Sequence, residues 1–159
     1  MKELDFHIHA VIKTEDELTS QEVKLLDEAR KATYRSYAPY SHFSVGAAVE
    51  LEDGTIVSGN NQENAAYPSG LCAERTAVFY ANSRYPDQPI RRICIAARDT
   101  KGQFLQRPIS PCGACRQVLL EAEQRAKNAI EVLLYGTDGV YVISSIKDLL
   151  PFGFDESFL

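Results

Sequence analysis

The amino-acid sequence predicts an α/β fold, a three-layer α-β-α sandwich around one mixed five-stranded sheet. Two observations lead to this prediction. Helical and strand-like hydrophobic patterns follow one another along the chain in the order α-β-β-α-β-α-β-β. The last two strands are separated only by the short turn 136–139, whereas parallel neighbours need a crossover of about a dozen residues or more. The last strand pair is therefore expected to be antiparallel.

Length and composition limit the number of domains and the classes of partner that the chain can have. The chain has 159 residues, enough for one domain over residues 1–159 with a buried core; residues 1–18 form an N-terminal extension. A net charge of −5 argues against a nucleic-acid partner, because phosphates are bound by a basic face. Acidic residues and histidines interrupt the N-terminus, and no other stretch approaches membrane length. We therefore expect a cytoplasmic protein with no membrane partner.

The first part of the chain is expected to contain an additional strand and then a helix. Apolar residues alternate with more polar ones over 4–12, which predicts a strand within the extension. Thr19 and Glu22 have the spacing of a capping box. Apolar residues at helical spacing follow as far as Tyr37, and Pro39 ends the helix.

The middle of the chain predicts a hairpin, a loop and a second helix. Residues 43–51 alternate cleanly, Asp53-Gly54 is typical of a hairpin turn, and 55–58 returns as the partner strand. A polar loop then runs over 59–70. The second helix is expected to begin near Cys72 and to continue to about Asn82.

The last part predicts strands buried on both faces around a third helix. Residues 93–97 form a short, continuously apolar run of the kind that a sheet covered on both faces requires. A helix is expected over 113–127, with one apolar stripe. Strands over 130–135 and 140–143 and a short helix toward Leu150 complete the pattern.

Three of the four cysteines form a pattern typical of a catalytic zinc site. Cys72 lies in Cys-Ala-Glu-Arg, and Cys112 and Cys115 lie in Pro-Cys-Gly-Ala-Cys-Arg-Gln, both at predicted helix starts. There the helix dipole favours the thiolate form, and a spacing of three lets Cys112 and Cys115 face one point. Three protein ligands leave the fourth position of a tetrahedral Zn²⁺ open, as in catalytic sites. The sequence therefore predicts one zinc ion per subunit.

Glu74 is the predicted general acid and base. It lies two residues after Cys72, within reach of a zinc-bound water whose pKa the metal lowers to about 7. A carboxylate there can pass protons to a ring nitrogen and to a leaving amine. The Cys-x-Glu and Pro-Cys-x-x-Cys spacing is that of zinc deaminases with three cysteine ligands. Arg75 is predicted to donate hydrogen bonds to the ligand sulfurs, because zinc with three thiolates carries a net charge of −1.

The same cysteines and two histidines also admit other interpretations. Cys-Gly-Ala-Cys also fits a thioredoxin-like redox motif, but that interpretation leaves the Cys72 motif unused. A closed four-cysteine site would need Cys94, which lies in a predicted buried strand without a CxxC partner. His7 and His9 are two residues apart on one strand face and form a less favoured candidate metal pair.

Several separated motifs, in the expected order, resemble the small homotetrameric cytidine deaminase family over about residues 20–154. The motifs that carry this resemblance are Tyr37–Ala48, Asn61–Tyr67, Cys72–Ala77, Pro111–Gln117 and Leu149–Phe154. The chain departs from the family pattern in its N-terminal extension, at Gln62 and in Pro68-Ser69-Gly70.

The resemblance also implies substrate contacts and support for the metal ligands. Phe43 would stack near the pyrimidine, Asn61 and Glu63 would bind the ribose hydroxyls, the backbone around Ala66 would hold the base, and Phe154 would approach a neighbouring subunit's pocket. Arg75 and Gln117 would support the cysteine sulfurs. The resemblance further implies a homotetramer.

The predicted activity is hydrolytic deamination of cytidine, 2′-deoxycytidine or both. A zinc-bound hydroxide would attack C4 to give the uracil nucleoside and ammonia, a reaction of pyrimidine salvage. Glu63 in a sugar site would repel a nearby 5′-phosphate, which favours nucleosides over nucleotides. Two alternatives share the zinc motifs: a deaminase of an aminonucleoside antibiotic, and a zinc-binding module without catalysis.

Overall fold

Three helices and six strands make up the computed structural model, which describes residues 1–159. In chain order these elements are β1 (Ala10–Lys13), α1 (Ser20–Ala32), β2 (Ser44–Leu51), β3 (Ile56–Asn60), α2 (Ala73–Arg84), β4 (Ile90–Arg98), α3 (Gly113–Ala126), β5 (Glu131–Gly136) and β6 (Gly139–Ile143). The predicted capping box starts α1, where the Thr19 hydroxyl accepts from Glu22 N–H and the Glu22 carboxylate accepts from Thr19 N–H.

All six strands form one mixed sheet in the order β1-β6-β5-β4-β2-β3. Only β4 and β5 are parallel, and α3 provides the crossover between them. The antiparallel pairing predicted for the last two strands is confirmed, since Gly136 pairs with Gly139 across the turn and Val132 with Ile143 at the far end.

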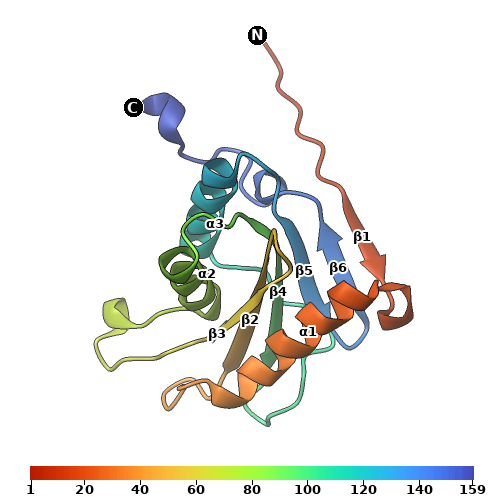
Figure 1. The fold of residues 1–159 in the computed structure, drawn as a ribbon, viewed down its shortest axis with the longest axis vertical. Helices are drawn as coiled ribbons and strands as arrows, with labels where there is room; N and C mark the ends of the chain where they lie inside the picture. Colours follow the sequence, from red (N-terminus) through yellow and green to blue (C-terminus); the bar gives the residue numbers. More distant parts are fainter.

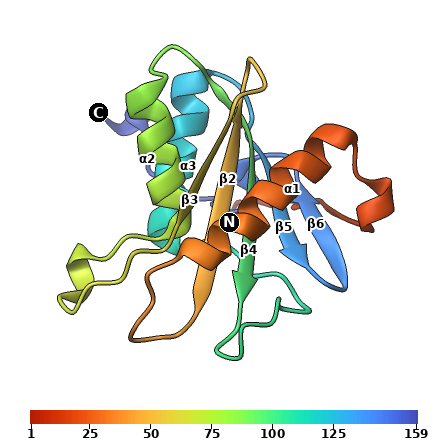
Figure 2. The same ribbon diagram turned by 60° about the horizontal axis from the view of Figure 1, so that its bottom comes forward.

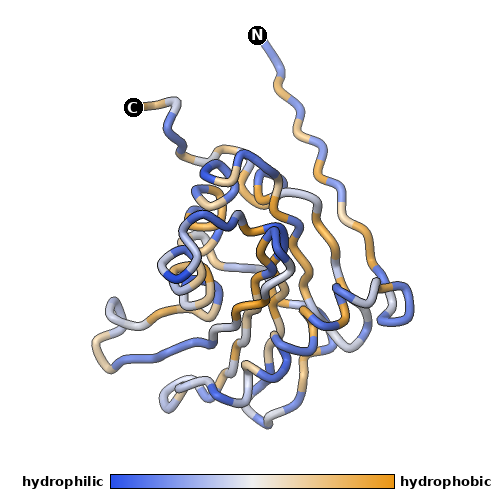
Figure 3. The backbone as a smooth tube through the Cα atoms, in the orientation of Figure 1, coloured by the Kyte–Doolittle hydropathy of each residue, from blue (hydrophilic) through white to orange (hydrophobic).

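The helices cover both faces of the sheet, which confirms the three-layer prediction. In Figures 1 and 2, α1 lies against one face and α2 and α3 lie side by side against the other. Leu25 and Leu26 of α1 pack with one buried cluster, and Ala77 of α2 and Leu119 of α3 pack with the other. Figure 3 shows many hydrophobic residues along the strands between these layers.

The close packing of α1 on β2 depends on a glycine. A Cβ atom at Gly46 would lie 2.2 Å from the carbonyl oxygen of Ala29 and 2.7 Å from the Thr33 nitrogen. Only a residue without a side chain fits between this strand and the helix. Gly46 therefore sets the depth of α1 on the sheet, just after the loop whose Tyr40 and Ser41 line the candidate site.

The sheet has six strands where five were predicted, because the N-terminal extension adds β1 to its edge. This strand begins at Ala10, later than the predicted residue 4. Ala10 pairs with Ile143, where β6 ends, so residues 1–9 extend past the end of the neighbouring strand. The length of β6 therefore fixes where β1 begins.

The first helix ends at Ala32, before the predicted end at Tyr37, and continues as a 3-10 turn over Thr33–Arg35. Arg98 of β4 donates to the hydroxyl of Thr33 at 3.0 Å and to its carbonyl at 3.1 Å. That carbonyl is therefore bound to a distant strand instead of the next helical turn. None of the helices has the length and apolar character needed to cross a membrane.

Candidate active site

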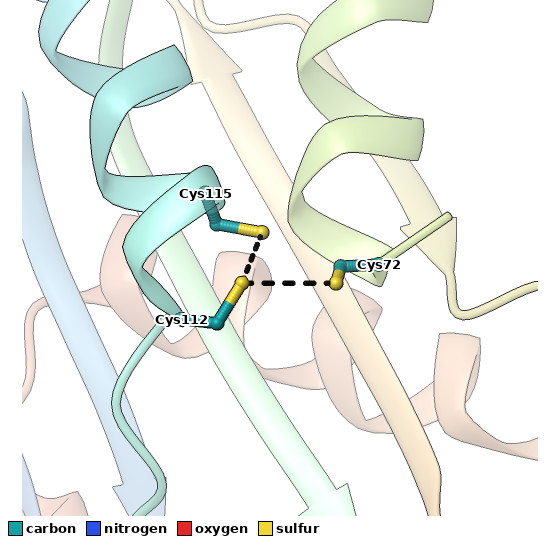
Figure 4. A group of neighbouring side chains, drawn as sticks. All are labelled: Cys72, Cys112 and Cys115. Atoms are coloured by element: carbon teal, nitrogen blue, oxygen red, sulfur yellow. Dashed lines mark hydrogen bonds between the residues drawn. The ribbon is translucent and has the colours of Figure 1, made fainter. Parts of the chain in front are cut away.

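The beginnings of α2 and α3 bring three cysteine sulfurs together. Cys72 is the N-cap residue of α2, Cys112 is the N-cap residue of α3, and Cys115 follows in the first turn of α3. The sulfur of Cys112 lies 3.9 Å from that of Cys72 and 3.5 Å from that of Cys115. Figure 4 shows the three side chains pointing toward one another from the two helices.

This spacing fits a tetrahedral zinc ion. A Zn–S distance of about 2.3 Å gives ligand sulfurs about 3.8 Å apart. All three sulfurs lie within 4.8 Å of one another, and no other histidine, cysteine or carboxylate belongs to the group. Cys115 is buried whereas Cys112 is exposed, so the cluster can be approached from solvent. The residues thus fit a metal that keeps one coordination position for water or substrate.

The surroundings of Cys72 at the start of α2 stabilise thiolate sulfur. Arg75 Nη2 lies 3.6 Å from the Cys72 sulfur and donates to it. The Cys115 thiol and Arg75 both donate to Cys72, and together they lower the pKa of Cys72 to about 5. The same interaction with Cys72 raises the pKa of Cys115, which retains its proton while Cys72 ionises. Anionic sulfur is the form that binds zinc.

Glu74 lies beside this cluster in the first turn of α2. Its side chain is 4% exposed, and burial is the largest cause of a raised pKa, to which the nearby Cys72 also contributes. A carboxyl group whose pKa is raised toward neutrality can accept and donate protons within one reaction cycle. The position of Glu74 is suited to proton transfer next to the metal site.

A cavity of about 460 Å³ adjoins the first cysteine. Asn61 and Glu63 line it together with Cys72 and Arg75. Tyr67, Gln62, Asn64, Tyr40, Ser41, Gly70 and Leu71 complete its wall. Two of the predicted substrate residues and two groups of the cysteine site therefore share one cavity. Phe43 and Glu74 are not on its wall.

Asn61 and Glu63 are held by the loop that precedes β2. The Asn61 amide accepts from Val45 N–H at 2.8 Å and donates to the Phe43 carbonyl at 2.9 Å. The Glu63 carboxylate accepts from the Ser41 hydroxyl and from the backbone of Tyr40 at 2.9 Å. The Ser41 hydrogen bond is the largest cause that lowers the pKa of Glu63. The lowered pKa favours the ionised carboxylate of Glu63, which can only accept hydrogen bonds.

The remaining predicted residues, Ala66, Gln117 and Phe154, make no hydrogen bond to the sulfurs and do not line the cavity. Ala66 is exposed in the loop between β3 and α2, where its N–H donates to the Asn64 side chain at 2.9 Å. Phe154 is 58% exposed, and its carbonyl accepts from Gln117 Nε2 at 2.8 Å. Gln117, expected to support a cysteine sulfur, thus makes its hydrogen bond to the C-terminal segment.

Two residues that the sequence analysis did not assign are part of this arrangement. Ser41 bonds Glu63 and lines the cavity. The Arg116 guanidinium donates to the Pro111 carbonyl at 2.9 Å, next to Cys112, and to the Leu149 carbonyl at 2.8 Å. Arg116 directly follows Cys115, and that adjacency was the one signal in the sequence that pointed to it.

The structure does not support a four-cysteine metal site that includes Cys94. Cys94 lies in β4 within the buried cluster on the α1 face, whereas the α2 and α3 face carries the cysteine group. Burial raises the pKa of Cys94 to about 12, so it stays a neutral thiol. His7 and His9 precede β1 and lie outside the only group of three or more metal-ligand residues.

A family model and the sequences of known proteins point to the same family. Residues 19–130 match the family described as cytidine and deoxycytidylate deaminase zinc-binding region. A cytidine deaminase of Sporosarcina psychrophila is 42% identical over 133 residues, which cover 84% of this chain and 90% of that protein. A cytidine deaminase of Halalkalibacterium halodurans is 41% identical over 130 residues, with 82% and 91% coverage.

Solved structures agree with this result. The crystal structure of a cytidine deaminase from Burkholderia pseudomallei superposes with a TM-score of 0.72 at 39% identity, covering 86% of this chain and all of that one. A cytidine deaminase from Mycobacterium tuberculosis gives a TM-score of 0.64 at 33% identity, with 84% and 97% coverage.

Proposed function

The chain belongs to the cytidine and deoxycytidylate deaminase family, and from that premise we propose that it hydrolyses cytidine, 2′-deoxycytidine or both to the uracil nucleoside and ammonia. The observation that carries the proposal is the group of three sulfurs at zinc spacing with the buried carboxyl of Glu74 beside it. The deaminase of aminonucleoside antibiotics is not favoured, because the relatives and solved structures above are named cytidine deaminases.

Cys72, Cys112 and Cys115 would hold one zinc ion per subunit. When bound, zinc supplies a Lewis acid that lowers the pKa of a coordinated water to about 7. Arg75 donates to the Cys72 sulfur and so offsets part of the negative charge of three thiolates. The two helix dipoles act in the same direction.

Glu74 would move the protons of the reaction. Water adds to C4 of the pyrimidine, and Glu74 takes a proton from it and delivers it to the ring nitrogen. Glu74 then takes the proton of the new C4 hydroxyl and delivers it to the exocyclic amine, so that the C4–N bond breaks and ammonia departs as the C4 carbonyl forms. Burial raises the pKa of Glu74, which favours its acting as an acid as well as a base.

The substrate would lie with its sugar at Asn61 and Glu63, which line the cavity beside Cys72. An ionised Glu63 accepts hydrogen bonds from hydroxyl groups and repels phosphate, so the site suits a free nucleoside. Phe43 would stack on the base, the backbone around Ala66 would hold its edge, and Phe154 would contact a neighbouring subunit's pocket.

Exposed aromatic side chains support a homotetramer. Tyr67 is 77% exposed, and Phe79 and Tyr80 on α2 are 48% and 57% exposed. Large exposed aromatic side chains are enriched at protein interfaces, and closed symmetric assemblies are the commonest form of homo-oligomer. Light scattering is expected to give four times the chain mass of 17.7 kDa. A monomeric mass at micromolar concentration would contradict the assembly.

We place the protein in the cytoplasm, because zinc binding requires three reduced thiols and that compartment keeps thiols reduced. Cell fractionation is the corresponding measurement, and recovery of the protein with an oxidising compartment would contradict the placement.

An ammonia-release assay on the zinc-loaded protein tests the function. Cytidine and 2′-deoxycytidine are expected to release ammonia, whereas CMP reacts much more slowly because of the Glu63 charge. Adenosine and a single-stranded oligonucleotide are expected to release none. Release from an aminonucleoside antibiotic alone would establish the first alternative, and bound zinc with no release from any compound would establish the non-catalytic module.

A further inference from the structure

The loop that enters β2 has a backbone conformation that neighbouring groups must hold. His42 adopts a left-handed φ of 54°, which is uncommon for a residue other than glycine. Its N–H donates to the Ala38 carbonyl at 3.0 Å and closes a turn. Such a conformation persists where surrounding contacts fix it, and these contacts often belong to functional sites. The hydrogen bonds of Ser41 and Phe43, on either side of His42, are therefore the contacts to consider.

Ser41, directly before His42, connects the loop to the sugar-site carboxylate. Its hydroxyl donates to Glu63 Oε1, and its N–H donates to Oε2 at 3.2 Å. The same hydroxyl oxygen accepts from Phe43 N–H at 3.0 Å. The Ser41 hydroxyl thus donates its only proton to Glu63 and accepts a hydrogen bond from Phe43.

Phe43 is bound from its other side by the second sugar-site residue. Its carbonyl accepts from Asn61 Nδ2 at 2.9 Å. Both backbone polar groups of Phe43 are therefore hydrogen-bonded to side chains that line the cavity, Ser41 and Asn61. The Phe43 backbone is thus linked directly to Asn61, and through Ser41 to Glu63, the two groups expected to bind ribose.

We propose that Ser41 is a positioning residue that couples sugar recognition by Glu63 to base stacking by Phe43. The proposal rests on the function proposed above. Without the Ser41 hydroxyl, Glu63 retains two backbone donors but loses the one that orients Oε1, and Phe43 N–H loses its acceptor. A sugar whose hydroxyls engage Glu63 therefore also stabilises the loop that presents Phe43.

The kinetic test uses Ser41→Ala with Ser41→Thr, which keeps the hydroxyl. For cytidine, Ser41→Ala is expected to raise KM about 10-fold with kcat changed less than about twofold, as for loss of a ground-state hydrogen bond to a charged group. The increase is expected to be clearly smaller for 2′,3′-dideoxycytidine, which lacks the hydroxyls that Glu63 would bind. Ser41→Thr is expected to restore most of the wild-type KM.

A double-mutant cycle with Glu63→Ala separates coupling from simple loop damage. Ser41→Ala is expected to change KM much less in the Glu63→Ala background than in the wild type. Ser83→Ala, an exposed serine near the end of α2, is the matched control and is expected to leave KM unchanged. Additive effects, or equal KM increases for cytidine and its dideoxy analogue, would overturn the proposal.

Calorimetric binding of uridine to the same variants makes the test independent of turnover. Ser41→Ala is expected to weaken uridine binding about 10-fold and to leave the unfolding temperature near that of Ser83→Ala. If the protein released no ammonia, the proposed deaminase function would fail. The uridine affinities of the wild type and of Ser41→Ala would still test the role of Ser41. Unchanged uridine affinity would refute the role of Ser41 alone.

Discussion

Replacing Glu74 with glutamine is expected to lower turnover of cytidine by at least about 10²- to 10⁴-fold, the usual contribution of general acid–base catalysis. Glutamine has nearly the shape of glutamate but cannot accept and return a proton. Because Glu74 is 4% exposed, the substitution also removes the cost of burying an ionisable group, so we expect stability to be kept or slightly increased. The measurement is kcat for ammonia release at saturating cytidine.

Zinc content is the control that makes this result specific. Glu74 is not one of the three sulfur ligands, so Glu74→Gln is expected to carry one zinc ion per chain, as the wild type does. Loss of the metal together with activity would show that Glu74 holds the site and does not move protons. Near-wild-type turnover with zinc present would remove it from the reaction altogether.

Replacing Cys115 with alanine is expected to abolish both zinc binding and activity. Its sulfur is 3.5 Å from that of Cys112, and its removal leaves two thiolates, too few for a stable catalytic site. Metal binding also contributes to folding free energy, so the unfolding temperature is expected to fall by more than the loss of one small side chain explains. Metal analysis and thermal unfolding with and without a chelator measure the two effects.

Cys94→Ala is the matched control for this substitution. Cys94 and Cys115 are both 0% exposed, but they lie on opposite faces of the sheet. The control variant is expected to keep zinc and full activity, and to lose only about 1 kcal/mol of stability from its small cavity. If Cys94→Ala lost the metal, a closed site of four cysteines would have to replace the open one.

Two parts of the ligand group could be predicted from the sequence because each is local, whereas the approach of Cys72 to Cys112, 40 residues away, is a tertiary contact. Cys112 and Cys115 are three residues apart at a helix start, so one turn of helix places both sulfurs on one side. Glu74 follows Cys72 within the same first turn of α2. Backbone geometry over three or four residues determines such spacings, whatever the rest of the chain does.

The hydrogen-bond partners of Glu63 and Gln117 could not be predicted from such local patterns. Ser41 and Glu63 are 22 residues apart, and Gln117 and the Phe154 carbonyl are 37 apart. No periodicity relates such positions, because each contact depends on how segments far apart in the chain meet after the sheet has formed. Family resemblance implied the sugar-site role of Glu63, but nothing in the sequence pointed to Ser41 as its donor.

The sequence by itself determined the order of the elements, the antiparallel final pair and the cysteine pattern, since each follows from hydrophobic period, turn length or helical spacing. Only the tertiary structure decided where elements end. The short length of β6 leaves residues 1–9 beyond the ladder, and Arg98 ends α1 by binding Thr33 from a strand 65 residues away. Element ends depend on which distant groups satisfy the terminal backbone hydrogen bonds, and packing alone brings those groups into place.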